Sequence, residues 1–351
     1  MDADRRRLLR AAAYSVPALV VPGSSWWEKL SVQGSSRGSS TGRAVGRSDV
    51  DAVRDMVSLF SRIDQRRGGG HGRTAVAQYL TTDVAGALSG RFPNHQVRRD
   101  MFSAASELAY LCGWMAFDDA EHAIGQHYFA AAVKLAAEAD DPALAGHTLR
   151  AMAHQALELG HSQKAVELAA ASMDGDRYTL ASPRERALFG VVYGRTLVAT
   201  GQPQAAARTL LRAEDDLAAA TAGDEEPNRV FFFGEASLAH ETACALRDSG
   251  DLPGAVREFR RSVRTRKAAS FTRTHAVTLG YLGTVQARQG AIDEACATWS
   301  TALDAMDGVQ SGRTRQAVAT MRSVLSPLRA RGMRRVADLD ARAAGYLAAS
   351  T

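Results

Sequence analysis

An internal repeat, in which a glycine precedes an alanine at a fixed distance, constrains the fold of this chain more than any other feature. Four segments carry it: "LGHSQKAVELAAAS" (Leu159 to Ser172), "TGQPQAAARTLLRA" (Thr200 to Ala213), "SGDLPGAVREFRRS" (Ser249 to Ser262) and "QGAIDEACATWSTA" (Gln289 to Ala302). In each, an alanine follows the glycine by five residues, and an apolar residue follows four residues later. The glycines are Gly160, Gly201, Gly250 and Gly290, the alanines Ala165, Ala206, Ala255 and Ala295, and the apolar residues Ala169, Leu210, Phe259 and Trp299. This recurrence is typical of an array of similar structural units.

A further small residue lies seven positions before each glycine and gives the repeat a physical explanation. These residues are Ala153, Gly194, Ala243 and Gly283. We expect the small residue to let a second helix approach the first closely, and the glycine to end the first helix. The pattern therefore predicts an all-α fold of helix pairs. Two weaker copies run through Gly113, Ala120 (at the turn), Gly125, Phe129 and Ala132, and through Gly332, Ala337, Ala341 and Ala344.

These residues resemble the tetratricopeptide repeat. Leu282-Gly283 matches the family's first-helix motif, Gly250-Asp251 its turn, and Ala255 with Phe259 its second helix. The resemblance covers residues 102–344, although the copies lie about 40 to 49 residues apart instead of the usual 34 or so. It implies an α-solenoid of antiparallel helix pairs, a tetratricopeptide-like superhelix.

A narrower resemblance concerns function. Residues 102–161, from "FSAASELAYLCGWMAF" to "MAHQALELGH", together with "GGGHGRTAVAQYL", are similar to the sensor half of actinobacterial transcriptional regulators that carry a phage-repressor-type helix-turn-helix. No helix-turn-helix accompanies them in this sequence. The resemblance implies a non-enzymatic sensing and interaction protein that binds a peptide or small ligand in a groove and contacts a protein partner, with a homodimer left open.

The N-terminal segment allows two interpretations. Arg5-Arg6-Arg7-Leu8-Leu9-Arg10 resembles a twin-arginine export signal, but no A-x-A-like cleavage site follows, and the similar regulators carry such a segment as an interdomain linker. Its apolar stretch is too short to span a bilayer. The linker interpretation and three scattered cysteines favour the cytoplasm, with an exported scaffold as the alternative. We therefore divide the chain into a basic linker (1–47), N-terminal helices (48–100) and the repeat array (101–351).

Charge and motifs argue against nucleic-acid binding and catalysis. The net charge is +5, and residues 1–47 account for all of it with eight basic and three acidic residues. The remainder lacks the basic excess that non-specific DNA binding needs. "HETAC" (His240 to Cys244) has cysteine where a zinc-protease helix has its second histidine. We therefore expect no enzyme, no cofactor and no metal.

Two surfaces are candidate binding sites. In tetratricopeptide arrays the ligand-facing positions lie three before and one after the small first-helix residue, and here they are Tyr110, Trp114, Arg150, His154, Val191, Arg195, His240, Cys244, Gly280 and Thr284. These arginines and histidines would favour a small anionic ligand, but the same residues would equally suit buried packing. The second surface is a predicted helical stripe of Arg257, Arg260, Arg261 and Arg264, which is either simply solvated or a docking surface for an acidic partner.

Overall fold

The computed structural model describes residues 43–220, 226–329 and 334–349. Most of the predicted N-terminal linker, including the twin-arginine-like segment, lies outside these residues, as does Gly332 of the weakest repeat copy. The described part is all-helical, as predicted: it contains no β-strand, and its β contact is an isolated bridge between Ala44 and Arg91. None of its helices is long and apolar enough to cross a membrane.

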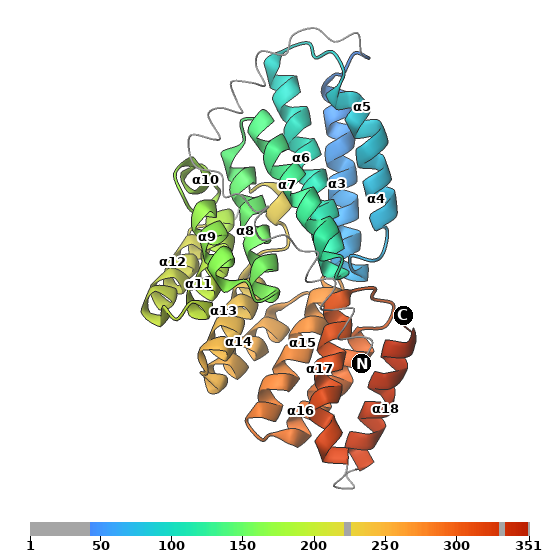
Figure 1. The fold of residues 1–351 in the computed structure, drawn as a ribbon, viewed down its shortest axis with the longest axis vertical. Coiled ribbons are helices and arrows are strands. Elements are labelled where there is room, and N and C mark those ends of the chain that lie inside the picture. The colour runs from blue at the N-terminus through green and yellow to red at the C-terminus, as the bar shows by residue number, and fades with distance from the viewer. Residues whose placement is uncertain (1–42, 221–225, 330–333, 350–351) are drawn as a thin grey trace. The chain divides into compact units, whose positions relative to one another are not determined.

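The chain divides into two compact units, which we describe separately (Figure 1). Unit 1 comprises the described residues of 1–61, 72–117 and 121–231, and unit 2 those of 62–71, 118–120 and 232–351. The helices assigned mainly to unit 1 are α3 (Arg47–Arg67), α4 (Arg73–Tyr79), the π-helix η2 (Leu80–Val84), α5 (Ala85–Leu88), α6 (His95–Asp118), α7 (His122–Glu138), α8 (Pro142–Glu158), α9 (Ser162–Ser172), α10 (Asp176–Thr179), α11 (Pro183–Ala199), α12 (Pro203–Ala218) and the 3₁₀ helix η3 (Asn228–Val230). Unit 2 contains α13 (Glu235–Ser249), α14 (Leu252–Thr265), α15 (Thr272–Arg288), α16 (Ile292–Ala305), α17 (Gly312–Arg329) and α18 (Arg334–Ala349).

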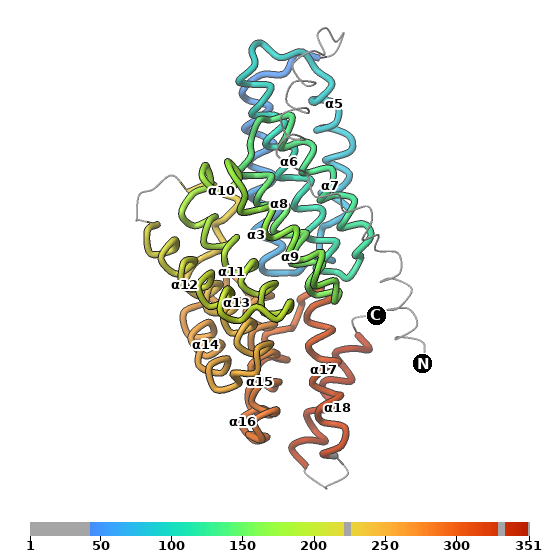
Figure 2. The backbone as a smooth tube through the Cα atoms, turned by 60° about the vertical axis from the view of Figure 1, so that its left-hand side comes forward, coloured from blue at the N-terminus to red at the C-terminus, as the bar shows by residue number. Residues whose placement is uncertain are grey.

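Neighbouring helices pack as the pairs that the repeat predicts. The four repeat glycines lie at the turns of the pairs α8/α9, α11/α12, α13/α14 and α15/α16. All four have left-handed φ angles, between 75° and 94°, which glycine adopts without steric cost. Ala120, the predicted turn residue of the earlier copy, has a φ of 67° although it is not glycine. The helix pairs and their turns are thus confirmed. Figure 2 also shows α17 beside α18 within unit 2.

The small first-helix residues lie where the second helix comes closest. A β-carbon added at Gly113 would lie 2.7 Å from the ring of Phe129, and one at Gly194 would lie 2.8 Å from Leu210. At Gly283 it would lie 2.5 Å from Nε1 of Trp299. These distances are too short for real β-carbon contacts, so a larger residue would force the paired helices apart.

Polar side chains begin several of these helices. The side chain of Asp141 accepts a hydrogen bond from the amide of Leu144 at the start of α8, and Ser182 forms a reciprocal capping box with Glu185 at the start of α11. Pro142 and Pro183 occupy the first turns of the same helices, where a missing N–H costs nothing. The caps also fix the carboxylates of Asp141 and Glu185 in place.

The segment "TAVAQYLTTDVAGAL", which predicts one helix, contains an irregularity. It forms α4 and α5 with the π-helical turn η2 between them. Thr81 and Thr82 both donate side-chain hydrogen bonds to the carbonyl oxygen of Gln78 in the preceding turn. Such back-bonding competes with the regular helical ladder, which gives the interruption a physical cause.

We predict that Gly283→Ala destabilises unit 2 by about 1–3 kcal/mol, because the new methyl group would displace the fully buried Trp299. The matched control is Gly345→Ala in α18, where an added β-carbon meets nothing within 4 Å. That substitution should be neutral or slightly stabilising, since alanine favours helix. Chemical denaturation followed by circular dichroism measures both, and equal stability of the two variants would contradict the assigned contact.

Candidate functional site

The structure brings four of the predicted groove residues into contact within unit 1. Tyr110 and Trp114 lie on α6, and Arg150 and His154 lie on α8. The rings of Tyr110 and Trp114 stack with centroids 6.4 Å apart, and His154 meets the edge of Trp114 at 5.8 Å. One Nη of Arg150 donates to the hydroxyl of Tyr110 at 3.0 Å, and its guanidinium lies 5.8 Å from the Trp114 ring centre. We call these four residues the α6–α8 wall.

Burial differs among the members of this wall. Tyr110, Arg150 and His154 are buried, with Arg150 only 1% exposed, whereas Trp114 is partly exposed. His154 also contacts Glu158 at 2.9 Å, one turn along the same helix. Because Trp114 is the member that solvent reaches, a ligand at this wall would contact its indole first. Whether the wall binds a ligand stays a prediction.

His147 extends the wall toward α11 and is held in its neutral form. Its Nε2 lies 3.2 Å from Nη2 of Arg150. Since a guanidinium can only donate, Nε2 accepts, and the ring proton lies on Nδ1, which faces a Glu185 oxygen at 3.9 Å. Burial lowers the pKa of His147 well below its ordinary value, and the charges of Arg150 and Arg229 lower it further.

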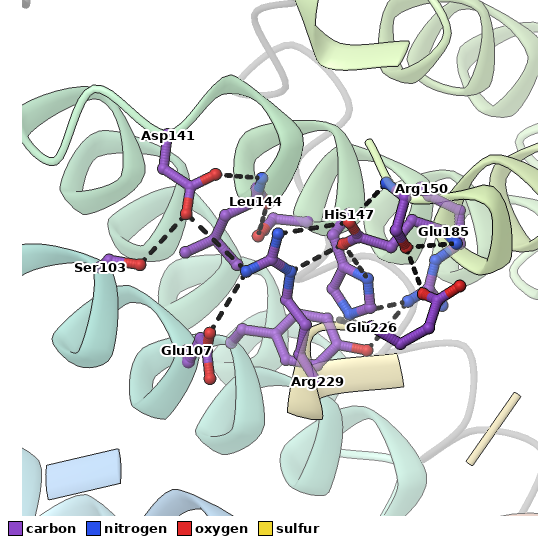
Figure 3. Close-up of polar contacts among 12 residues, drawn as sticks. Ser103, Glu107, Asp141, Leu144, His147, Arg150, Glu185, Glu226 and Arg229 are labelled. Carbon is purple, nitrogen blue, oxygen red and sulfur yellow. Dashed lines mark hydrogen bonds and ion pairs between the residues drawn. The ribbon is translucent and has the colours of Figure 1, made fainter. Parts of the chain in front are cut away.

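Arg229 lies at the centre of a partly buried ionic cluster beside this wall, in which Glu185 is buried and Arg229, Glu107 and Asp141 keep some exposure (Figure 3). Its guanidinium donates from Nε to Glu185 at 2.7 Å and from Nη1 to Glu107 at 3.3 Å, and Nη1 lies 3.7 Å from Asp141. Ser103 adds a hydrogen bond to Asp141 at 3.1 Å. The three carboxylates come from α6, α11 and the residue that caps α8, so η3 is tied to three elements at once.

The pKa values in this cluster reflect that burial. Burial raises the pKa of Glu107, against the opposing charge of Arg229. For Arg229 itself burial lowers the pKa, but the carboxylates of Glu185, Asp141 and Glu107 together raise it above its ordinary value. Three carboxylates on one guanidinium therefore keep Arg229 charged and hold the acids in one arrangement. This is an ion-pair network with every charge engaged.

The remaining groove candidates lie on other helices than the α6–α8 wall. Arg195 and Val191 are buried on α11. In unit 2, Nδ1 of His240 on α13 contacts the hydroxyl of Thr278 on α15 at 2.9 Å, and Cys244 contacts the same ring at 3.8 Å. Thr284, partly buried on α15, donates to the carbonyl of Gly280 in its own helix at 3.0 Å. A ligand role for these positions stays a prediction.

The predicted basic stripe lies on α14. Arg257, Arg260 and Arg264 are exposed, and Arg261 is partly exposed. The opposite face of the helix buries Ala255, Phe259 and Ser262 against the unit. The stripe is thus a single surface, as its spacing indicates.

A second buried ionic cluster lies in unit 2. Arg273 donates to Asp64 at 3.0 Å and to Asp118 at 2.9 Å, and all three side chains are at most 2% exposed. The amide of Gly69 also donates to Asp118 at 2.9 Å. Burial raises the pKa of Asp64 to about 6 despite Arg273, and the charge of Asp118 contributes to the rise. Two acids share one base here, so protonating Asp64 balances the cluster.

Sequence reasoning missed both buried clusters for a physical reason. The cap signals at Asp141-Pro142 and at Ser182 with Glu185 are visible in the sequence, but nothing there indicates that one arginine joins them. Arg229 lies 44 residues from Glu185 and 122 from Glu107. Arg273 lies 209 residues from Asp64. Only tertiary packing connects such distant charges.

Neither the coordination chemistry nor the comparisons with known proteins assign an activity. Among the described residues, no group of three or more histidine, cysteine, aspartate or glutamate side chains is arranged to hold a metal ion. No protein-family model and no curated protein matches the chain. A functional assignment must therefore come from the geometry itself.

We predict that Arg229→Met destabilises unit 1 by about 2–4 kcal/mol near neutral pH, because the buried Glu185 and the partly buried Glu107 and Asp141 lose their cation. The cost should be smaller near pH 5, where protonation removes part of the uncompensated charge. Arg47→Met is the control: its side chain is 62% exposed in pairs with Asp51 and Asp100, so its loss should cost under about 1 kcal/mol. Urea denaturation at both pH values measures the free energy of unfolding of each variant. If Arg229→Met and Arg47→Met lost similar amounts of stability near neutral pH, the stabilising role of the cluster would be contradicted.

A pH dependence follows from Asp64. Its pKa in the folded chain is about 6, above the ordinary 3.8, so the folded state binds this proton more tightly than the unfolded state. Its contribution to stability is therefore fully present below about pH 3.8 and is lost as the pH rises from there through about 6. Asp64→Asn should flatten this dependence, whereas the exposed Asp307→Asn should leave it unchanged. Hydrogen exchange of the α15 amides from about pH 4 to 7 measures this dependence. An unaltered slope in Asp64→Asn would show that another group titrates.

Proposed function

We propose that this protein is a non-enzymatic helical-repeat sensing and interaction protein. In this proposal the helix pairs stack as a tetratricopeptide-like superhelix, similar to the sensor half of helix-turn-helix regulators. The chain binds a peptide or small anionic ligand at the α6–α8 wall and acts through a protein partner, in the cytoplasm.

One observation carries the proposal: within each unit, a first helix contacts the next first helix through polar side chains. Tyr110, three residues before Gly113, meets Arg150, three residues before Ala153. His240, three residues before Ala243, meets the next first helix at Thr278. First helices that contact one another in this way within a unit suit an extended binding surface better than a single reaction centre.

The chemistry of the α6–α8 wall supports an anionic ligand. Within the described residues, the contacts of Arg150 are to the neutral groups of Tyr110, Trp114 and His147, and its Nε has no hydrogen-bond partner. A buried guanidinium without a carboxylate can gain a charge-assisted, bidentate partner. By contrast, Arg229 is already saturated with carboxylates, and we assign it a structural role.

The proposal is tested by carboxylate-dependent binding to the full-length chain. The probes are short fluorescent peptides with a free C-terminal carboxylate and the same peptides as C-terminal amides. We expect carboxylate-dependent binders whose affinity falls at least about tenfold in Arg150→Met. The exposed Arg288→Met is the charge-matched control and should bind normally.

Two further measurements make the outcome clear. Circular dichroism establishes that Arg150→Met is folded, and Trp114→Ala probes the partly exposed end of the same wall. If the folded wild type shows no carboxylate-dependent binder, or if binding is indifferent to both substitutions, the α6–α8 wall is not the binding site.

A further inference from the structure

The basic stripe on α14 contains arginines in two different electrostatic situations. Arg260 pairs with Glu294 on α16 at 2.7 Å, and Arg261 pairs with Glu235 on α13 at 3.0 Å and with Glu258 at 3.4 Å. These two are therefore partly neutralised by their own unit. Arg257 and Arg264 are exposed and have no ion-pair partner among the described residues.

The two unpaired arginines lie at a defined spacing. They are seven residues apart on one helix, which places them two turns, or about 10.5 Å, apart along the axis and on nearly the same face. Leu252–Thr265 buries Phe259, Ala255 and Ser262 on its other side, so the stripe is held on a fixed backbone. A partner therefore meets two cations at a fixed distance.

The surrounding charges select the class of partner. The carboxylates of Glu235, Glu258 and Glu294 lie among the arginines, and a continuous phosphate backbone would be repelled by them. A partner helix with two separate carboxylates fits this pattern. It places negative charge opposite Arg257 and Arg264, at the two ends of the stripe, and none opposite the glutamates between them.

We propose that the α14 stripe is a docking surface for an acidic helix of a partner protein, with carboxylates seven residues apart that pair with Arg257 and Arg264. This rests on the proposed interaction function and gives it a second surface, separate from the α6–α8 wall. Exposed ion pairs are individually weak, so the surface adds little affinity. Its main effects are to orient the partner and to speed its association.

The test uses two alanine-rich helical peptides of identical composition with fluorescent labels. One carries its glutamates at i and i+7, and the other carries them at i and i+5, on different faces. We expect the full-length chain to prefer the i, i+7 peptide at low ionic strength, with added salt weakening the complex. Fluorescence anisotropy measures both affinities.

Charge reversal separates docking from general attraction. Arg257→Glu combined with Arg264→Glu should weaken binding of the i, i+7 peptide by about tenfold, because two attractive pairs become repulsive. Arg288→Glu together with Arg335→Glu, both at exposed positions, makes the same change of net charge elsewhere in unit 2 and should have at most about a twofold effect.

Three outcomes would overturn the proposal: equal binding of the two peptides, equal losses in the two charge-reversed proteins, or displacement of the peptide by an equal charge concentration of mixed-sequence duplex DNA. These results leave the proposed function itself standing if carboxylate-dependent binding still requires Arg150. Conversely, if the peptide docks on α14 but no ligand binds at the α6–α8 wall, only the binding role proposed for the wall is contradicted.

Discussion

The close approach of paired helices is the contact on which the rest of the structure depends. It is possible because the first helix has no side chain, or only a methyl group, where the second helix presents an apolar residue, as Gly283 faces Trp299 and Gly194 faces Leu210. The same chain segment then turns through a left-handed residue, so each pair is short and antiparallel. Close packing of this kind gains dispersion energy across the whole helix length, which suits a chain whose commonest buried apolar residue is alanine.

This arrangement leaves the first helices to contact their successors through larger and more polar side chains. Tyr110 contacts Arg150 at the equivalent position of the next first helix, and His240, at that position of α13, contacts Thr278 of α15. Contacts within a pair combine close apolar packing with hydrogen bonds to backbone carbonyls, as Trp299 donates to Gly280 and Ser262 to Ala236. The contacts between these first helices instead join two polar side chains. The position of these polar groups follows from helix geometry, because the residues three before and one after the small packing residue lie about 60° and 100° around the helix from it, on an adjacent face. A binding function at the α6–α8 wall would use the face that already carries the polar groups.

Much of the fold could be predicted because its determinants are local in the sequence. A glycine or Ala120 at the turn, a small residue seven before it and an alanine five after it all lie within one helix pair, so spacing alone locates the helices. The grouping of Tyr110 with Trp114 and of Arg150 with His154 is equally local, since each pair is one helical turn apart. The contact of Tyr110 and Trp114 with Arg150 and His154 could be predicted only from the register of the repeat. The clusters around Arg229 and Arg273 were not accessible, because each joins carboxylates from distant parts of the chain.

The ionic clusters around Arg229 and Arg273 fix the register of the helices, which alanine-rich packing specifies poorly. Small side chains give smooth helix surfaces, which fit together at several neighbouring offsets with similar energy, so they specify register poorly. A guanidinium bound to two or three buried carboxylates tolerates no such displacement, because a shift of one residue would leave an uncompensated charge in the interior. Arg229 fixes α6, α8 and α11 through Glu107, Asp141 and Glu185, and Arg273 fixes Asp64 and Asp118 in the other unit. We infer that the buried arginines set the positions of the helices, whereas the exposed arginines of α14, which nothing in the interior requires, are available to a partner.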